Sequence, residues 1–403
     1  MVKYKNQHFV PQFYLRQFSK DLLTINQYSI TTKNSMKKGI KNSCSKSYFY
    51  ANNGLFEACL SPLENIFNDV FIKLYKEMDL TKLSKEDYAY ILYFICIQYT
   101  RTDKLKIESE EFFDAAYKGY LKEIYSSMPN FTKEKSGIKE LIDLLEKCKI
   151  TATGAYDQSF PHMQSMLLGL TSPFLIYDLV PLLLLNHTNQ DYIISDHPIV
   201  LYNKFFNAKR EMGLTGFASH GLQIFFPIGP KVLLLLYDKN FYNFNTDTNT
   251  QIVNLEEDVT AMNSLQFFNC HELILFSDER QSEYINNLHR KLETSLNKNP
   301  EKFKWIICPS SFGLPTLYMK MNRNNIEYDL ELSFMSLKKV SEANGYCRNL
   351  QGIDEQRSIL NSLEKKYHEY ASKDSGLRYQ SFDGIKANRK STICRAPSVQ
   401  REL

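Results

Sequence analysis

The sequence predicts an α+β fold in which a helical first half precedes a mixed half that contains an antiparallel sheet. Two observations predict it. Apolar residues recur at helical spacing in successive segments up to about residue 182, whereas from residue 191 short apolar runs of strand length are separated by turn residues. The chain has 403 residues and 43% hydrophobic residues, which is enough to build one large core or two.

The first half begins with an aromatic segment, "QHFVPQFYLRQF", in which Pro11 favours a helix over residues 11–18. "LLTINQYSITTK" then alternates enough to predict a strand, and a Lys/Asn/Ser-rich loop follows at 31–47. Ser61 as N-cap and Pro62 in the first turn, with a capping box, predict the start of a long helix. Further helices are expected from Ser84, where the sequence becomes apolar on all sides, and over 105–125, 137–149 and 157–182.

The second half predicts strands joined by tight turns, with three more helices. "DYIISDHPIVLYN" predicts two strands around a turn, and "LQIFFPIGPKVLLLLYD" predicts a hairpin at its Pro-Ile-Gly-Pro segment. Helices are expected over 255–271, 278–297 and 353–372, with strand-like pieces at 272–277 and within 303–340. We divide the chain into a core over 1–300, helical over 1–185 and sheet-containing over 186–300, followed by an extension over 301–371 and a basic tail over 372–403.

Charge and composition limit the class of protein. The tail carries seven Lys and Arg against three Asp and Glu, which accounts for the whole formal charge of +4. It is either a solvated end, which we favour, or an arm that contacts phosphate groups. The longest apolar runs are too short to span a bilayer, no signal peptide is visible, and the eight cysteines lack CxxC spacing. We therefore expect a cytoplasmic protein with reduced thiols and no membrane partner.

Polar residues interrupt the aromatic opening segment. Gln12 and Arg16 are four apart and share a helix face, and His8 lies just before the helix start. One interpretation is a hydrogen-bonded polar set at a helix end. The other is a proton-transfer histidine beside an anion-binding arginine.

A second polar pair, Gln98 and Arg101, ends the apolar helix that starts at Ser84. Burying an amide and a guanidinium is costly unless they find partners, and we expect Glu64, Asp196 or a ligand in that role. Asp196 follows an apolar strand, where it is either an exposed site residue or the start of an Asx-turn. The histidines show no zinc-binding spacing, and no phosphate-binding loop or nucleophile elbow is visible.

Taken in order, "HFVPQFYLRQF", "YFYA" with "LSPLEN", "IQYTRT", "IISDHPIVLYN", "FFPIGPKVLLLLYD" and "AMNSLQFFNCHELILFS" resemble the bacterial family called domain of unknown function 4238. The resemblance covers roughly residues 5–280, and the opening block is its most specific segment. It marks His8, Pro11, Gln12, Tyr14, Leu15, Arg16, Phe18, Glu64, Gln98, Arg101, Ser195, Asp196, Pro198 and Asn263. His197 stands where the family pattern usually has Asn, so it is not counted as catalytic.

The resemblance also implies a setting in mobile-element and phage-defence neighbourhoods, where nucleases and other toxic effectors are common. We therefore predict a nuclease that cleaves phosphodiesters, in which a histidine transfers the proton and guanidinium groups hold the phosphate. The predicted catalytic residues are His8, Arg16, Arg101 and Asp196, the predicted substrate contacts are Gln12, Tyr14, Gln98 and Asn263, and the candidate metal ligands are Glu64 and Asp196.

Two alternatives stay open at this stage. The same residues could bind a nucleotide or nucleic acid without turnover, or they could form a buried network that only docks the N-terminal helix. The sequence requires no cofactor, leaves a divalent metal open, and names no protein partner.

Overall fold

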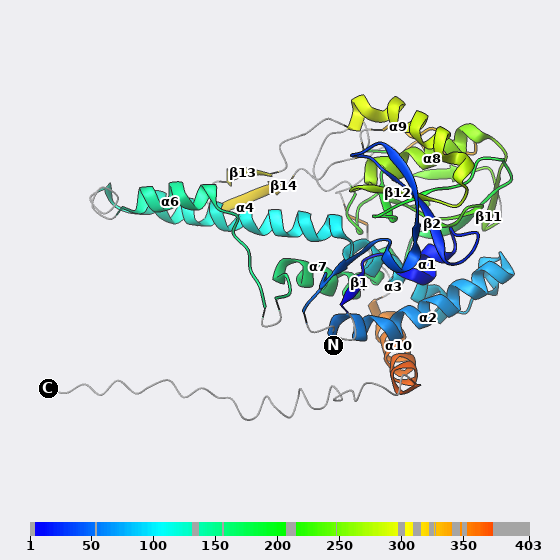
Figure 1. The fold of residues 1–403 in the computed structure, drawn as a ribbon, viewed down its shortest axis with the longest axis horizontal. Coiled ribbons are helices and arrows are strands. Elements are labelled where there is room, and N and C mark those ends of the chain that lie inside the picture. The colour runs from blue at the N-terminus through cyan, green and yellow to red at the C-terminus, as the bar shows by residue number, and fades with distance from the viewer. Residues whose placement is uncertain are drawn as a thin grey trace.

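The computed structural model has the α+β architecture that the sequence predicts, with helices packed around two main sheets (Figure 1). The structure describes residues 5–52, 55–130, 137–154, 157–206, 215–246, 248–296, 303–308, 316–321, 326, 328–340, 347–348 and 353–373. The predicted basic tail lies outside the described residues from position 374 onward.

The helices occupy most of the first half and three separate places in the second. They are α1 (Gln12–Arg16), α2 (Leu55–Glu77), α3 (Lys85–Thr100), α4 (Asp103–Ser127), α6 (Ile138–Lys147), α7 (Phe160–Thr171), α8 (Glu256–Asn269), α9 (Ser282–Leu296) and α10 (Ile353–Lys373). Short 3-10 turns are η1 (Ile40–Asn42), η2 (Leu80–Lys82), η3 (Pro173–Ile176) and η4 (Glu279–Gln281). Helix α3 begins as predicted, because Ser84 and Asp87 form a reciprocal capping box.

The predicted start of the preceding long helix at Ser61 is wrong. Helix α2 begins at Leu55, so Pro62 lies inside it. Ala58 and Leu60, which precede the proline, are buried. Their packing extends the helix upstream of a residue that on its own favours the first turn.

The larger sheet has the order β11 (Thr250–Val253), β5 (Val180–Asn186), β9 (Val232–Tyr237), β8 (Gln223–Gly229) and β7 (Val200–Tyr202). Its pairs are antiparallel except β11 with β5, which is parallel. The predicted hairpin is β8–β9, with Pro227 inside β8 and a register shift between Pro227 and Gly229.

The second sheet joins the two halves of the chain. Its order is β3 (Asn34–Gly39), β2 (Thr24–Ser29), β12 (Leu273–Phe276) and β6 (Ile194–Ser195), all antiparallel. Strand β3 is an exposed edge. The described residues also form three two-stranded pairs: β1 (Asn6–His8) with β4 (Ser45–Ser47), β10 (Tyr242–Phe244) with β15 (Met335–Leu337), and β13 (Phe303–Cys308) with β14 (Thr316–Met321).

One hydrophobic core spans the predicted boundary at residue 185. Helix α3 is buried on nearly all sides, and the Phe94 ring lies 5.6 Å from the ring of Phe226 on β8. The same core includes Leu363 of α10, which packs against α2 and α3. The Tyr90 and Ser362 hydroxyls lie 2.8 Å apart across this contact. The helices of the first half and the sheet of the second therefore stabilise one another.

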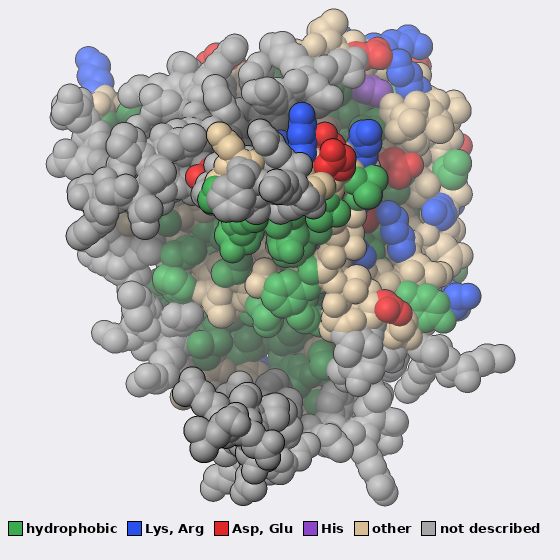
Figure 2. All heavy atoms as spheres, turned by 90° about the vertical axis from the view of Figure 1, so that its left-hand side faces the viewer, with side chains coloured by type: hydrophobic (Ala, Val, Ile, Leu, Met, Phe, Trp, Pro, Cys, Tyr) green, Lys and Arg blue, Asp and Glu red, His purple; other side chains and the backbone are tan. Residues whose placement is uncertain are grey.

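Helices α4 and α6 lie side by side and extend away from the rest of the molecule (Figure 1). Ion pairs such as Lys122–Glu146 (2.7 Å) hold them together. Hydrophobic side chains gather on the side of the molecule toward which α4 and α6 extend (Figure 2). On these two helices, Tyr120 and Leu144 are 59% and 58% exposed. No helix among the described residues is both long enough and apolar enough to cross a membrane.

Candidate functional site

The opening motif anchors the start of the chain in the core, and its predicted helix is α1. Pro11, with extended backbone, precedes α1, and Phe13, Tyr14 and Leu15 are buried. The Tyr14 hydroxyl donates a 2.5 Å hydrogen bond to the carbonyl of Pro227 on β8. Tyr14, predicted to contact substrate, therefore has a partner inside the protein.

Arg101 lies at the centre of the predicted residues. Its guanidinium is buried and donates to the Tyr50 hydroxyl (2.9 Å), to Glu64 Oε1 (2.8 Å) and to the His8 carbonyl (2.7 Å). Burial opposes its charge, yet Tyr50 and nearby carboxylates raise its pKa above the ordinary value. The predicted partner Glu64 is confirmed, and Arg101 meets His8 through the backbone of His8.

Glu57 belongs to this cluster although the sequence pattern did not indicate it. It is seven residues before Glu64 on α2, so both carboxylates lie on the same helix face. Burial raises the pKa of Glu57 to about 7, the charge of Arg101 opposes this shift, and Glu64 adds to it. Its Oε2 atom is buried without a hydrogen-bond partner among the described residues.

The His8 imidazole itself faces the other way. It is 5% exposed, and its Nε2 lies 3.4 Å from the carbonyl of Ile40. Burial lowers its pKa, the Ile40 carbonyl opposes the shift, and the charges of Arg101 and Arg16 add to it. Arg16 is exposed and donates to Gln12 Oε1 (3.1 Å), as their spacing predicts.

Gln98 is fully buried next to the start of the chain. Its Nε2 donates to the Phe9 carbonyl (3.0 Å), and its Oε1 has no hydrogen-bond partner within the described segments of the chain. Together with Arg101, it ties α3 to the segment before α1. Proton transfer by His8 and phosphate binding by the arginines stay predictions.

Asp196 is buried at the end of β6, where it holds the loop that leads into β12. Its carboxylate accepts three backbone N–H groups, from His271 (2.8 Å), Glu272 (2.8 Å) and Leu273 (3.0 Å). Burial raises its pKa, while these three donors oppose the rise. The contacts give Asp196 a positioning role for residues 271–273, and a reaction role for its carboxylate stays a prediction.

Asn263 on α8 braces the strand that leads to Asp196. Its Oδ1 accepts the N–H of Ile193 (3.0 Å), and its Nδ2 donates to the Asp191 carbonyl (2.9 Å). Nothing in this pattern leaves the amide pointing to solvent. Of the residues predicted to contact substrate, Gln12 is the one that lies nearest the surface, since Tyr14, Gln98 and Asn263 are buried.

Lys46, Asp103 and His271 form a polar group that we call the surface group; Lys46 and His271 are exposed, and Asp103 between them is buried. Asp103 Oδ2, at the start of α4, lies 2.6 Å from Lys46 Nζ and 3.7 Å from His271 Nε2. His271 is the residue whose backbone N–H Asp196 accepts, and Asp103 follows Arg101 by two residues. No spacing signal indicates this group in the sequence, because its members come from distant segments.

The lysine-rich loop predicted at 31–47 is β3, η1 and β4. It contains Lys33, Lys37, Lys38, Lys41 and Lys46 and no acidic residue. All but Lys38 are exposed. We call residues 31–47 the basic segment.

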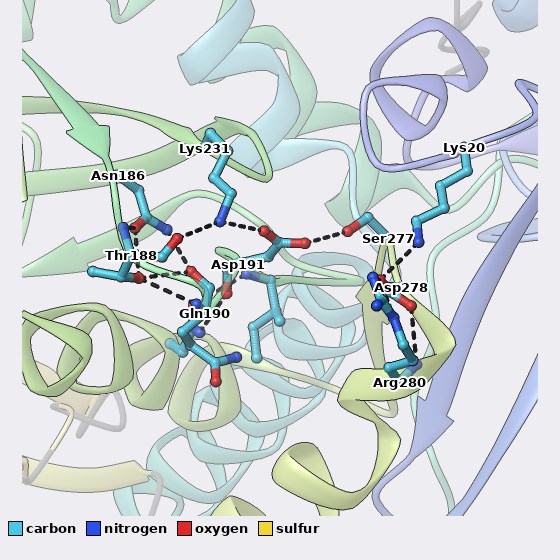
Figure 3. Close-up of polar contacts among 11 residues, drawn as sticks. Lys20, Asn186, Thr188, Gln190, Asp191, Lys231, Ser277, Asp278 and Arg280 are labelled. Atoms are coloured by element: carbon cyan, nitrogen blue, oxygen red, sulfur yellow. Dashed lines mark hydrogen bonds and ion pairs between the residues drawn. The ribbon is translucent and has the colours of Figure 1, made fainter. Parts of the chain in front are cut away.

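A surface cleft of about 260 Å³ lies beside the basic segment, lined by Lys20, Asp21, Thr24, Asn26, Lys37, Ser277, Asp278, Glu279 and Arg280. Its three cations face three acids. Lys20 and Arg280 both pair with Asp278 and hold its pKa well below the ordinary value (Figure 3). Asp191, which accepts from Ser277 and pairs with Lys231, continues this network away from the cleft (Figure 3). Because its charges balance, the cleft by itself is no anion site.

Comparison with known proteins identifies the family. A family model described as "Protein of unknown function (DUF4238)" matches residues 6–280. The chain belongs to the DUF4238 family. The DUF4238 match includes the Arg101 cluster, Asp196 and the surface group around His271, and it ends before α9 and α10. Searches of curated proteins and of solved structures returned no match.

The candidate metal ligands are both engaged within the protein, Glu64 with Arg101 and Asp196 with backbone N–H groups. Among the described residues, no group of three or more His, Cys, Asp or Glu side chains could hold a metal ion.

Proposed function

We propose that this DUF4238 protein binds nucleic acid and acts on it as a nuclease. The basic segment supports the binding half of the proposal. Its five lysines, with no acidic residue among them, lie just before the exposed edge strand β3, on that strand, and on the turn and strand that follow it. Clustered lysines bind the phosphate backbone without reading its sequence, and released counterions drive the binding.

The ion pairs around the basic segment determine which lysines matter most. Lys33 pairs with Glu293 (2.7 Å), Lys37 with Asp21 (3.3 Å) and Lys46 with Asp103 (2.6 Å). The pairs of Lys33 and Lys37 are exposed on both sides and therefore weak, so a phosphate can compete for these two lysines. Asp103, the partner of Lys46, is buried. Lys38 and Lys41 form no ion pair with any described residue, so their charge is available without such competition.

A nuclease and a non-catalytic binding module would both use the basic segment. They differ in whether the bound nucleic acid is cleaved. A role as a toxic effector in phage defence stays a prediction, and we assign no additional residue to it. The family resemblance and the surface group at the end of the basic segment, where Lys46 contacts Asp103, favour the nuclease.

The test is fluorescence anisotropy of a labelled single-stranded RNA over a salt series. Neutralising Lys37, Lys38 and Lys41 together with alanine should weaken binding at least about tenfold and reduce the salt slope by about 2, since each phosphate contact contributes about 0.7 on single strands.

The matched control removes the same charge elsewhere, at the exposed Lys76, Lys82 and Lys85. It should leave the slope unchanged. Equal effects of the two triple variants would show that net charge, and not the basic segment, drives binding. No binding of the unaltered protein at low salt would refute the proposal outright.

A further inference from the structure

The surface group beside the basic segment has the composition of an acid–base site. His271 lies between α8 and β12, and its Nε2 is 3.7 Å from Asp103 Oδ2 at the first residue of α4. Lys46 Nζ lies 2.6 Å from the same oxygen. The group therefore brings a histidine, a carboxylate and an ammonium together from three segments.

The residues marked by the family resemblance hold this group in place. Asp196 accepts the backbone N–H of His271, and Lys104 donates to the Asn269 carbonyl (3.0 Å), which ties the start of α4 to the same loop. Arg101 fixes the end of α3 just before Asp103 through its contacts with Glu64 and Tyr50. Buried groups held by several hydrogen bonds are suited to such positioning, because they resist movement.

His271 is accessible, unlike His8, which the opening motif favoured as the proton-transfer residue. It is 37% exposed on its side chain, whereas His8 is 5% exposed and faces a carbonyl. His368 on α10 also lies near a carboxylate, Glu364, at 4.0 Å, but it is outside the segment that the family model matches. His271 is therefore an exposed histidine whose carboxylate neighbour, Asp103, also pairs with Lys46 of the basic segment.

We propose that His271 is the general base of an RNA-cleaving site, oriented by Asp103 and completed by Lys46. This inference rests on the proposed function and names its substrate class and its reacting group. RNA fits because its 2′-hydroxyl supplies the nucleophile, so one base next to the phosphate is enough to start the reaction.

The geometry assigns each proton. Asp103 Oδ2 lies 3.7 Å from Nε2 of His271, too far for a direct hydrogen bond, but its negative charge favours the tautomer with the proton on Nε2. Nδ1 is then the atom that takes the proton of the 2′-hydroxyl. The 2′ oxygen then forms a bond to phosphorus, and the bond from phosphorus to the 5′ oxygen breaks. The ammonium of Lys46 donates a proton to the leaving 5′ oxygen. The products are a 2′,3′-cyclic phosphate and a 5′-hydroxyl, and water returns both side chains to their starting protonation states.

The experiment uses the full-length protein with a labelled single-stranded RNA and the all-2′-deoxy strand of the same sequence. We expect cleavage of the RNA to cyclic phosphate ends and no cleavage of the deoxy strand. His271→Gln should reduce cleavage by about 100-fold or more, the scale of a lost general base. Its RNA affinity and melting temperature should stay unchanged, because the side chain is at the surface.

His368→Gln is the matched control, an exposed histidine near a carboxylate, and should cleave as the unaltered protein does. Undiminished cleavage by His271→Gln would overturn the assignment, as would cutting of the deoxy strand or 5′-phosphate products. RNA binding without any cleavage by the unaltered protein would also overturn it and leave only the binding half of the proposed function. Failure to bind would instead refute the proposed function, so the two failures are distinguishable.

Discussion

Replacing Glu57 by glutamine should stabilise the protein in a way that depends on pH. Glu57 is mostly buried beside Arg101 and Glu64, and burial raises its pKa from 4.5 to about 7. The raised value means that the folded state holds the proton of Glu57 more tightly than the unfolded state does. Ionising this carboxyl therefore costs folding free energy.

The magnitude follows from the two pKa values. One pKa unit corresponds to about 1.36 kcal/mol, so a change from 4.5 to about 7 sets an upper bound of about 3 kcal/mol. Below pH 4.5 both states are protonated and nothing is lost. Stability falls as the pH rises from 4.5 to about 7, and the full cost is present above that range. Because Glu57 is partly exposed, solvent screening reduces the cost to about 1–2 kcal/mol.

Glu57→Gln imitates the protonated carboxyl at every pH. The variant should therefore be more stable than the unaltered protein at about pH 8, by about 1–2 kcal/mol, and nearly equal to it at about pH 4. Urea denaturation followed by far-UV circular dichroism at both pH values measures the difference. Glu77→Gln, at an exposed position of the same helix, is the control and should change neither midpoint. A Glu57→Gln variant without added stability at the higher pH would refute the reasoning.

Three further substitutions test the buried polar contacts. Arg101→Met should cost about 3–5 kcal/mol in urea denaturation, since it leaves Glu64 without its partner; a loss below about 1 kcal/mol would contradict a tightly paired guanidinium. Tyr14→Phe removes the hydrogen bond to Pro227 and should cost about 1–3 kcal/mol, because a buried carbonyl loses its donor; an unchanged urea midpoint would contradict this. Asp196→Asn replaces one acceptor oxygen by an amide donor that faces backbone N–H groups, and it should speed amide hydrogen exchange at residues 271–273. Unchanged exchange there would show that Asp196 does not hold the loop in place.

Helical spacing was the most informative feature of the sequence. The apolar run after Ser84 correctly predicted a buried helix, and the cost of burying Arg101 correctly limited its partners to a few candidates, of which Glu64 is the observed one. The sequence does not indicate Glu57, because Pro62 by itself favours a first helical turn that would leave Glu57 outside the helix. With the helix starting at Leu55, the seven-residue spacing of Glu57 and Glu64 would have predicted a paired carboxylate face.

Contacts between distant segments could not be predicted in this way. The pairing of β2 with β12 cannot be seen in the local sequence of either strand, because an alternating or an apolar run predicts a strand without indicating its partner. His271 has no motif around it, because Asp103 and Lys46 reach it from other elements. The backbone-directed roles of Asp196 and Asn263 also escaped prediction, since a residue type does not show whether its partner is a ligand or an N–H group.

Helix α10 has a consequence for how the family segment can be handled. Leu363 completes the core and Ser362 meets Tyr90 on α3, although the family match ends at residue 280. A fragment trimmed to the recognisable sequence would present the outer side of α3 to water, and we expect it to precipitate or need a solubilising partner. The shared ancestry of a segment and its ability to fold unaided are therefore separate properties in this chain.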